Sequence, residues 1–304
     1  MIYTVTLNPS IDYVMAVPDY ISGATNRAQT TNAYPGGKGI NVSRILEANH
    51  INNQAWGFLG GYTGAFIATT LQHLAIKTDF TPIQGTTRIN VKLKSRQETE
   101  INASGPQITD AEWQTFKQQF SKLQPADTVV FSGSLPSTLP HDAYQQLIQL
   151  VVSKQANFII DTTGDDLKQA LALHPLLVKP NRDEVQALFK LTDISLNSLK
   201  IAGQQLIAGG AQQAIISLGG DGALLFANNH VYFAEPIAGD LQNSVGAGDS
   251  MIGGFLAQWT IEEDPVTAFK LGVASATATA FSEDIATQTK IRSILDHVHI
   301  TEIG

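Results

Sequence analysis

A glycine-rich turn that leads into a helix contains the residues of this sequence best suited to chemistry. Gly246, Ala247 and Gly248 precede Asp249, and the apolar residues within 251–259 recur at helical spacing. Free N–H groups at the start of a helix bind anions, and the helix dipole favours negative charge there. Asp249 therefore places a carboxylate in an anion site. It is either a helix cap or a reactive base.

A second glycine segment, residues 36–39, offers backbone N–H groups and one lysine at a predicted helix start. It is not a Walker A motif. With Lys38 as the motif's lysine, that motif requires Gly at position 32 and Ser or Thr at position 39, where this chain has Asn32 and Gly39. The segment is either an anion-binding turn or a plain glycine turn with a solvated lysine.

Three basic side chains lie in or near extended segments close to this turn. Arg27, Lys38 and Arg88 could converge on a phosphate group, to which arginine presents a two-pronged donor. Each of them taken singly is more commonly a surface charge. The formal net charge of −8 argues against nucleic acid as a partner, so an anionic substrate would need a local cluster of this kind.

Asn181 and Glu184 follow a predicted strand that ends at Pro180. Their spacing is that of a capping box, in which the two residues satisfy the first amides of a helix. The same oxygen atoms suit Mg²⁺, which retains most of its waters and takes few protein ligands. Both interpretations stay open from the residues alone.

Composition sets the class of protein. The chain has 304 residues, 43% hydrophobic and 15% charged, and these proportions are typical of a soluble globular enzyme. It contains no cysteine, so disulfides, thiolate metal sites and a cysteine nucleophile are excluded. The N-terminal residues lack the pattern of a signal peptide, and no segment is apolar for long enough to span a membrane. We therefore expect a cytoplasmic protein.

Strands and helices alternate regularly along most of the chain. Such alternation predicts a parallel sheet covered by helices on both faces. The segments 78–103 read as short strands with polar alternation, which suits a sheet with one solvated or ligand-facing side. We expect one main domain with a small added sheet.

Ligands of open parallel sheets bind at the carboxyl ends of the strands. Small or polar residues follow nearly every predicted strand here, which suits one continuous cleft. These segments are 8–12, 132–134, 161–162, 179–181 and 217–222.

Two motifs resemble the signatures of the ribokinase-like, PfkB-type carbohydrate kinases. They are the segment 36–44, Gly-Gly-Lys-Gly-Ile-Asn-Val-Ser-Arg, and the segment 240–250, which contains Gly-Ala-Gly-Asp. The resemblance covers essentially the whole chain. It implies a single kinase domain over 1–304, a three-layer α/β/α sandwich with a mainly parallel central sheet and a small β-sheet lid. The lid is expected from about 10–35 and 85–105.

The resemblance also implies roles for individual residues. Asp249 would be the catalytic base, and the amides of Gly246, Ala247 and Gly248 would stabilise charge on the transferred group. The sugar phosphate would be bound by Asp12, Gly36, Gly37, Lys38, Asn41, Arg88 and Arg27. ATP would contact Lys179, Asn181, Ser217, Leu218, Gly219, Gly220, Asp221, Gly222, Gly248 and Asp249. Mg²⁺ would be held by Asn181 and, through water, by Glu184.

Within this family the chain is most similar to bacterial members that phosphorylate D-fructose 1-phosphate. The opening residues 1–14 and the run 87–94 carry that similarity. The expected activity is therefore MgATP-dependent phosphorylation at O6, with fructose 1,6-bisphosphate as product. Tagatose 6-phosphate is an alternative substrate, and a non-catalytic sugar-phosphate sensor is an alternative class. The resemblance further implies a homodimer formed through the lid.

Overall fold

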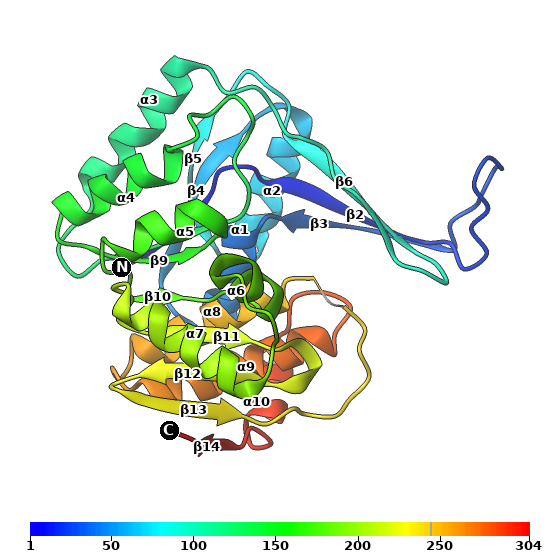
Figure 1. The fold of residues 1–304 in the computed structure, drawn as a ribbon. Coiled ribbons are helices and arrows are strands. Elements are labelled where there is room, and N and C mark those ends of the chain that lie inside the picture. The colour runs from blue at the N-terminus through cyan, green and yellow to red at the C-terminus, as the bar shows by residue number, and fades with distance from the viewer. Residues whose placement is uncertain (244) are drawn as a thin grey trace.

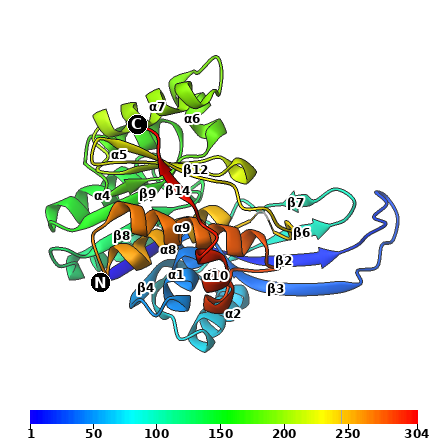
Figure 2. The same ribbon diagram turned by 90° about the horizontal axis from the view of Figure 1, so that it is seen from below.

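The computed structural model describes residues 1–243 and 245–304. Ser244, which belongs to the glycine-rich stretch considered above, lies outside the described residues. The chain forms three layers, in which helices cover both faces of one large sheet (Figures 1 and 2). No helix in the described ranges has the length and apolar character needed to cross a membrane.

The large sheet contains ten strands in the described ranges, in the order β14-β13-β12-β11-β10-β9-β8-β1-β4-β5. The strands from β5 to β11 run parallel, and β12, β13 and β14 are antiparallel additions. Their bounds are β1 Ile2–Thr6, β4 Asn53–Leu59, β5 Lys77–Pro82, β8 Thr128–Ser132, β9 Asn157–Asp161, β10 Leu177–Val178, β11 Ala214–Ser217, β12 Ala223–Ala227, β13 His230–Ala234 and β14 Ile300–Glu302. The predicted α/β class with a mainly parallel sheet is confirmed.

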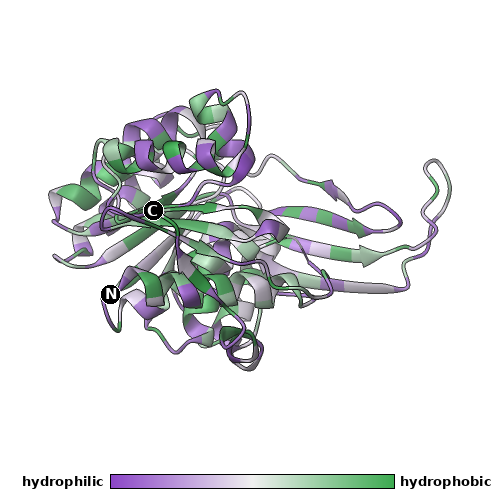
Figure 3. Cartoon of the chain, turned by 60° about the horizontal axis from the view of Figure 1, so that its bottom comes forward, coloured by the Kyte–Doolittle hydropathy of each residue, from purple (hydrophilic) through white to green (hydrophobic). Residues whose placement is uncertain are grey.

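Central strands are apolar on both faces because both faces are covered. Strand β8 is buried at all of its residues, which read Thr-Val-Val-Phe-Ser. One helix layer consists of α3 (Asp110–Gln119), α4 (Ala143–Ser153), α5 (Gly164–Leu171), α6 (Arg182–Phe189) and α7 (Leu196–Ala208). The opposite layer consists of α1 (Lys38–Ala48), α2 (Gly61–His73), α8 (Ala247–Trp259), α9 (Pro265–Ala280) and α10 (Gln288–Leu295). Figure 3 shows the apolar central sheet between these layers.

A second, four-stranded sheet projects from the edge of the main body (Figures 1 and 3). Its order is β3 (Thr30–Gly36), β2 (Ser10–Ala16), β6 (Arg88–Lys94) and β7 (Thr99–Ile101). Strands β2 and β6 are parallel, and their register places Ser10 opposite Arg88 and Asp12 opposite Asn90. The smaller sheet of the predicted fold is therefore present. Polar side chains alternate along it, as its sequence predicts.

Two details differ from the sequence-based expectations. Residues 77–82 do not belong with the polar strands that follow them, because β5 pairs with β4 at the edge of the large sheet. An edge strand is only partly covered, so its sequence alternates like that of the small sheet. The terminal strand β14 was not predicted, since three residues carry too short a pattern.

Candidate active site

A cavity of about 1130 Å³ lies along the carboxyl ends of the parallel strands and under the small sheet. Its walls come from β1, β8, β9 and β11 of the large sheet, from β2 and β6 of the small sheet, and from the start of α8. Most of the predicted site residues line it, although they are distant in sequence. These are Asp12, Gly37, Lys38, Asn41, Arg88, Lys179, Asn181, Glu184, Ser217, Gly219, Gly220, Gly222, Gly246, Ala247, Gly248 and Asp249.

Four predicted site residues do not line the cavity. Arg27 is exposed on the loop between β2 and β3. Gly36 lies behind Asp12, and a Cβ atom on Gly36 would come within 2.5 Å of the Asp12 carboxyl carbon. Gly36 therefore contributes by leaving room for Asp12. Leu218 is buried, and Asp221 pairs with Arg182 at 2.5 Å.

Asp249 is a buried carboxylate in the first turn of α8. Its side chain accepts a hydrogen bond of 2.9 Å from the amide of Asn41, which belongs to α1. Burial, together with the nearby charge of Asp161, raises the pKa of Asp249 to about 6, against the opposing effects of Lys38, Asn41 and Lys179. A carboxylate with this pKa is a competent proton acceptor near neutral pH.

The start of α8 is suited to bind an anion. Its N-cap is Gly246, which has a φ of 80° and no side chain with which to cap the helix. The first amides of the helix therefore face the cavity, which Gly246, Ala247 and Gly248 line. The hydrogen bond from Asn41 to Asp249 shows that this carboxylate is held from α1, on the cavity side of the helix.

A second buried carboxylate, Asp161, lies at the end of β9 and pairs with two lysines. Its Oδ2 is 2.9 Å from Nζ of Lys38, and its Oδ1 is 3.4 Å from Nζ of Lys179. Burial alone would raise the pKa of Asp161, but Lys179 and Lys38 hold it below its usual value. The pKa values of the two buried acids of the cavity are therefore shifted in opposite directions. Asp161 stays ionised, and Asp249 is the more basic.

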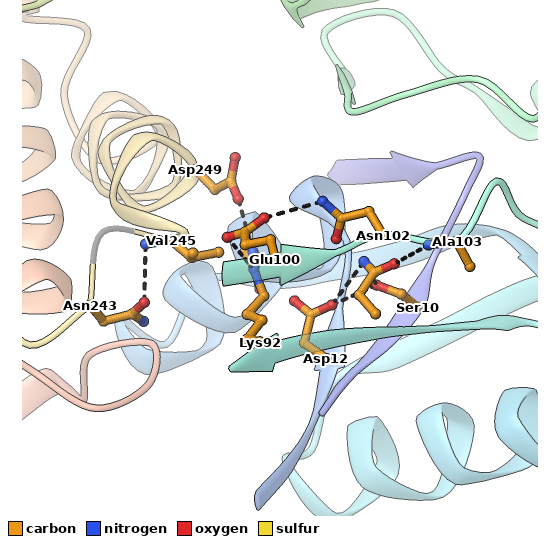
Figure 4. Close-up of polar contacts among 11 residues, drawn as sticks. Ser10, Asp12, Lys92, Glu100, Asn102, Ala103, Asn243, Val245 and Asp249 are labelled. Atoms are coloured by element: carbon orange, nitrogen blue, oxygen red, sulfur yellow. Dashed lines mark hydrogen bonds and ion pairs between the residues drawn. The ribbon is translucent and has the colours of Figure 1, made fainter. Parts of the chain in front are cut away.

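The small sheet presents a polar network to the cavity (Figure 4). Asp12 Oδ1 accepts hydrogen bonds from Ser10 at 2.8 Å and from Asn90 at 3.2 Å. Lys92 pairs with Glu100 at 3.1 Å, and Glu100 also accepts from Asn102. Such fixed carboxylate and amide groups are suited to sugar hydroxyls.

Arg88 stands where the small sheet joins the main body. It donates to the carbonyl oxygen of Ala103 at 2.7 Å and to that of Asn8 at 2.9 Å. Its Nε is buried and has no partner within the described residues. Burial lowers the pKa of Arg88, but an arginine stays charged nonetheless. A half-buried cation that lines the cavity is a candidate for binding a phosphate group of the substrate.

Asn181 and Glu184 form the predicted capping box at the start of α6. Asn181 Oδ1 accepts from the Glu184 amide at 2.8 Å, and Glu184 Oε2 accepts from the Asn181 amide at 2.8 Å. Both residues also line the cavity. The described residues contain no cluster of three acidic or histidine side chains, so a metal here would have few protein ligands. One carboxylate and one amide oxygen fit Mg²⁺ that is bound mainly through water and phosphate oxygens.

Another part of the cavity wall is more apolar. It is formed by residues of α9, by Phe281 directly after that helix, and by the loop after β13. These residues are Val273, Ala276, Thr277, Ala280, Phe281, Ile237, Ala238 and Gly239. Gly219 and Gly220 of the short 3₁₀ turn Gly219–Asp221 also line the cavity. A flat apolar base would fit against the apolar wall.

Sequence reasoning did not assign roles to several residues that the structure brings into the site. The sequence shows Asp161 only as a residue at the end of a predicted strand, and its partners cannot be predicted because they lie on α1 and after β10. Ser10, Asn90, Lys92 and Glu100 belong to strands whose alternation was visible. Which side of these strands faces the ligand depends on how the small sheet is placed against the large one, and their alternation alone does not give this placement.

Comparison with known proteins agrees with this geometry. Residues 5–291 match the model of the pfkB family carbohydrate kinases. The chain is 46% identical over its full length to the whole of a 1-phosphofructokinase of Bacillus subtilis, and 31% identical to the whole of a D-tagatose-1-phosphate kinase of Bacillus licheniformis. The structure of phosphofructokinase-2 from Escherichia coli, solved in complex with substrates and products, superposes with a TM-score of 0.93 at 26% identity, covering 97% of this chain and 98% of that one.

Proposed function

The chain belongs to the PfkB family of carbohydrate kinases, and on this premise we propose that it transfers the γ-phosphoryl group of ATP to O6 of D-fructose 1-phosphate. The product is fructose 1,6-bisphosphate. The observation that carries the proposal is Asp249, a buried carboxylate beside an uncapped helix start in a cavity that also contains Arg88. The full-length similarity to a 1-phosphofructokinase supports the choice of substrate.

The reaction needs a proton acceptor and stabilisation of negative charge. Asp249 accepts the proton of the 6-hydroxyl as this oxygen attacks the γ-phosphorus and the bond to the ADP leaving group breaks. The amides of Gly246, Ala247 and Gly248 stabilise charge on the transferred group. A general base of this kind typically contributes about 10²- to 10⁴-fold in rate. Positioning and electrostatics supply most of the rest.

The remaining cavity residues bind and orient the two substrates. Asp12, Gly37 and Asn41 hold sugar hydroxyls, and Arg88 holds the phosphate already on the sugar. The turn 217–222, with Lys179, contacts the nucleotide phosphates. Mg²⁺, when bound, would supply positive charge to these phosphates, and Asn181 and Glu184 would hold it, in part through water.

We assign the small sheet the role of a lid. It projects from the main body (Figure 1), and polar side chains of β2, β6 and β7 line the cavity. A closed lid would exclude water and thereby suppress hydrolysis of ATP.

The sheet also exposes Ile101, at 62%, and Ile21 on its long connecting loop, also at 62%. These apolar groups support a homodimer in which two lids pair, which light scattering of the wild type and of Ile101→Lys would test.

A coupled kinase assay tests the substrate. We expect kcat/KM for fructose 1-phosphate to exceed the values for tagatose 1-phosphate, tagatose 6-phosphate and fructose 6-phosphate. Fructose and tagatose differ only in configuration at C4, and one relative is named a D-tagatose-1-phosphate kinase, so tagatose 1-phosphate is the most informative competitor. A higher kcat/KM for either tagatose phosphate would reassign the substrate. Tight binding without turnover of any sugar phosphate would instead indicate a sensor.

A further inference from the structure

We propose that Asp161 is a positioning residue for phosphoryl transfer, which holds the ammonium groups of Lys38 and Lys179 at the transfer point and keeps Lys38 from pairing with Asp249. This inference rests on the proposed kinase function and deepens it. It assigns an acidic residue that touches neither the sugar nor the reacting oxygen, and that acts through two lysines.

The geometry is that of a clamp. Asp161 ends β9 and is 4% exposed, with Lys38 on one carboxylate oxygen at 2.9 Å and Lys179 on the other at 3.4 Å. Lys38 is the first residue of α1, and Lys179 follows β10. Three separate elements therefore meet at a single buried carboxylate, and each lysine is fixed by its own oxygen.

Both lysines line the cavity in which a γ-phosphoryl group would lie. A Cβ atom on Gly248 would be 3.1 Å from Nζ of Lys179, so this ammonium group is next to the first amides of α8. The side chain of Lys38 is 44% exposed and lines the cavity. Its charged neighbours are Asp161, Asp249 and Glu184. Positive charge is thus held between the proposed base and the proposed metal ligand.

Charge compensation explains why an acid is needed here. Two ammonium groups next to the positive end of a helix dipole repel one another in a buried site. Without Asp161, the nearest buried carboxylate available to Lys38 would be Asp249. Pairing with Lys38 would make Asp249 a weaker proton acceptor.

Asp161 is not itself suited to be the base. Both of its oxygens face lysines, which hold its pKa below the usual value. Asp249 has a raised pKa, and within residues 1–243 and 245–304 its one side-chain hydrogen-bond partner is Asn41. The sequence also predicted that Lys38 binds the phosphate of the sugar, and this role differs from the one proposed here, in which Asp161 holds Lys38 at the transfer point. The acidic neighbour of Arg88 is Asp12, whereas Lys38 faces Asp161 and Asp249. The two cations thus have different acidic neighbours.

The first test replaces Asp161 with its neutral isostere. In Asp161→Asn we expect kcat to fall about 10²-fold, a loss typical of removing one group that stabilises transferred charge, with KM for the sugar phosphate within about 3-fold of the wild type. The acidic limb of the kcat/KM profile should move to lower pH, because Asp249 loses a negative neighbour and gains Lys38. Asp79→Asn is the matched control, since Asp79 pairs with Lys122 at 2.6 Å and does not line the cavity.

A second variant keeps the test decisive if Asp161→Asn fails to fold. Lys38→Gln removes a partly exposed side chain and leaves Asp161 paired with Lys179. It should lower kcat with little change in KM for the sugar. Combined with Asp161→Asn, it should cost less than the product of the two separate losses, because both act on one unit.

Three results would overturn the clamp. They are a kcat within about 3-fold of the wild type in Asp161→Asn, a raised sugar KM with unchanged kcat in Lys38→Gln, and losses that multiply in the double variant. These outcomes leave the proposed function intact as long as the wild type turns over a sugar phosphate. Absence of turnover in the wild type would refute the function and the clamp together.

Discussion

The side-chain amide of Asn41 donates a hydrogen bond of 2.9 Å to Oδ2 of Asp249, although 208 residues separate the two in sequence. Asn41 lies in the first turn of α1, and Asp249 lies in the first turn of α8. These helices pack against each other, so the two glycine motifs form one site. The bond fixes one oxygen of the carboxylate, and the acid is thereby oriented before any substrate binds.

Loss of the proposed base should abolish most of the activity. We expect Asp249→Asn to lower kcat at least about 10²-fold, with KM for the sugar phosphate and for ATP nearly unchanged, because an amide keeps the shape but accepts no proton. Steady-state kinetics check this. A variant with near-normal kcat would remove Asp249 as the base.

The pH dependence of the wild type should report the same residue. Asp249 must be deprotonated to act, and its pKa is about 6, so kcat/KM should rise as the pH increases through about 6 and level off above it. For an acid with an ordinary pKa near 3.9, activity would stay level down to about pH 5. A profile without a limb near pH 6 would contradict the raised pKa.

How much of the site could be predicted from sequence depended on whether the partners were local. The amide-lined turn before Asp249 and the capping box of Asn181 are defined within a few residues, so spacing alone predicted both. The clamp on Asp161 could not be predicted, because its lysines come from elements that only the strand order brings together. The sequence pattern groups Arg27 with Arg88 because both are predicted to lie on alternating strands, yet Arg27 lies on the loop between β2 and β3 and does not line the cavity.

The same distinction between local and distant partners decides which parts of the fold could be predicted from the sequence. Long central strands and amphipathic helices were predicted correctly, since their apolar patterns are set by burial on fixed faces. Strand β5 and the strands of the small sheet have a similar alternation of polar and apolar residues, because each has one uncovered side. Pairing with β4 places β5 in the large sheet, and this pairing is not encoded in the alternation of β5 itself.

The two arginines that were grouped by sequence should behave differently. Arg88→Ala should raise KM for the sugar phosphate about 10-fold or more and change kcat less, because a charged hydrogen bond contributes about 1.5–3 kcal/mol. Arg27→Ala is the matched control, and we expect its KM to equal that of the wild type. Kinetics at varied sugar phosphate check both. A comparable rise in KM for Arg27→Ala would show that Arg27 belongs to the site, where it would be supplied by a second copy of the chain.

The packing beneath the catalytic turn should be sensitive to a single methyl group. A Cβ atom on Gly254 of α8 would lie 2.3 Å from Oγ of Ser275 and 2.6 Å from the carbonyl oxygen of Leu271, both on α9. Gly254→Ala should lower the free energy of unfolding by about 1–3 kcal/mol, as overpacking does. Gly220→Ala is the control, since nothing lies within 4 Å of its added Cβ. Denaturant unfolding measures both, and equal stabilities would show that α9 adjusts freely.

Two capping boxes in this chain allow the metal role of Glu184 to be separated from its structural role. Glu184 accepts from the amide of Asn181 at 2.8 Å, and Glu112 accepts from the amide of Thr109 at 2.7 Å, but only the first box lines the cavity. Glutamine can accept the same hydrogen bond, so Glu184→Gln and Glu112→Gln should each cost at most about 1 kcal/mol in unfolding free energy. Only Glu184→Gln should raise the Mg²⁺ concentration needed for half-maximal activity, because it removes the negative charge. Kinetics over a Mg²⁺ series, with unfolding curves for both variants, give the comparison. If the two variants had the same Mg²⁺ dependence, Glu184 would be a helix cap and nothing more.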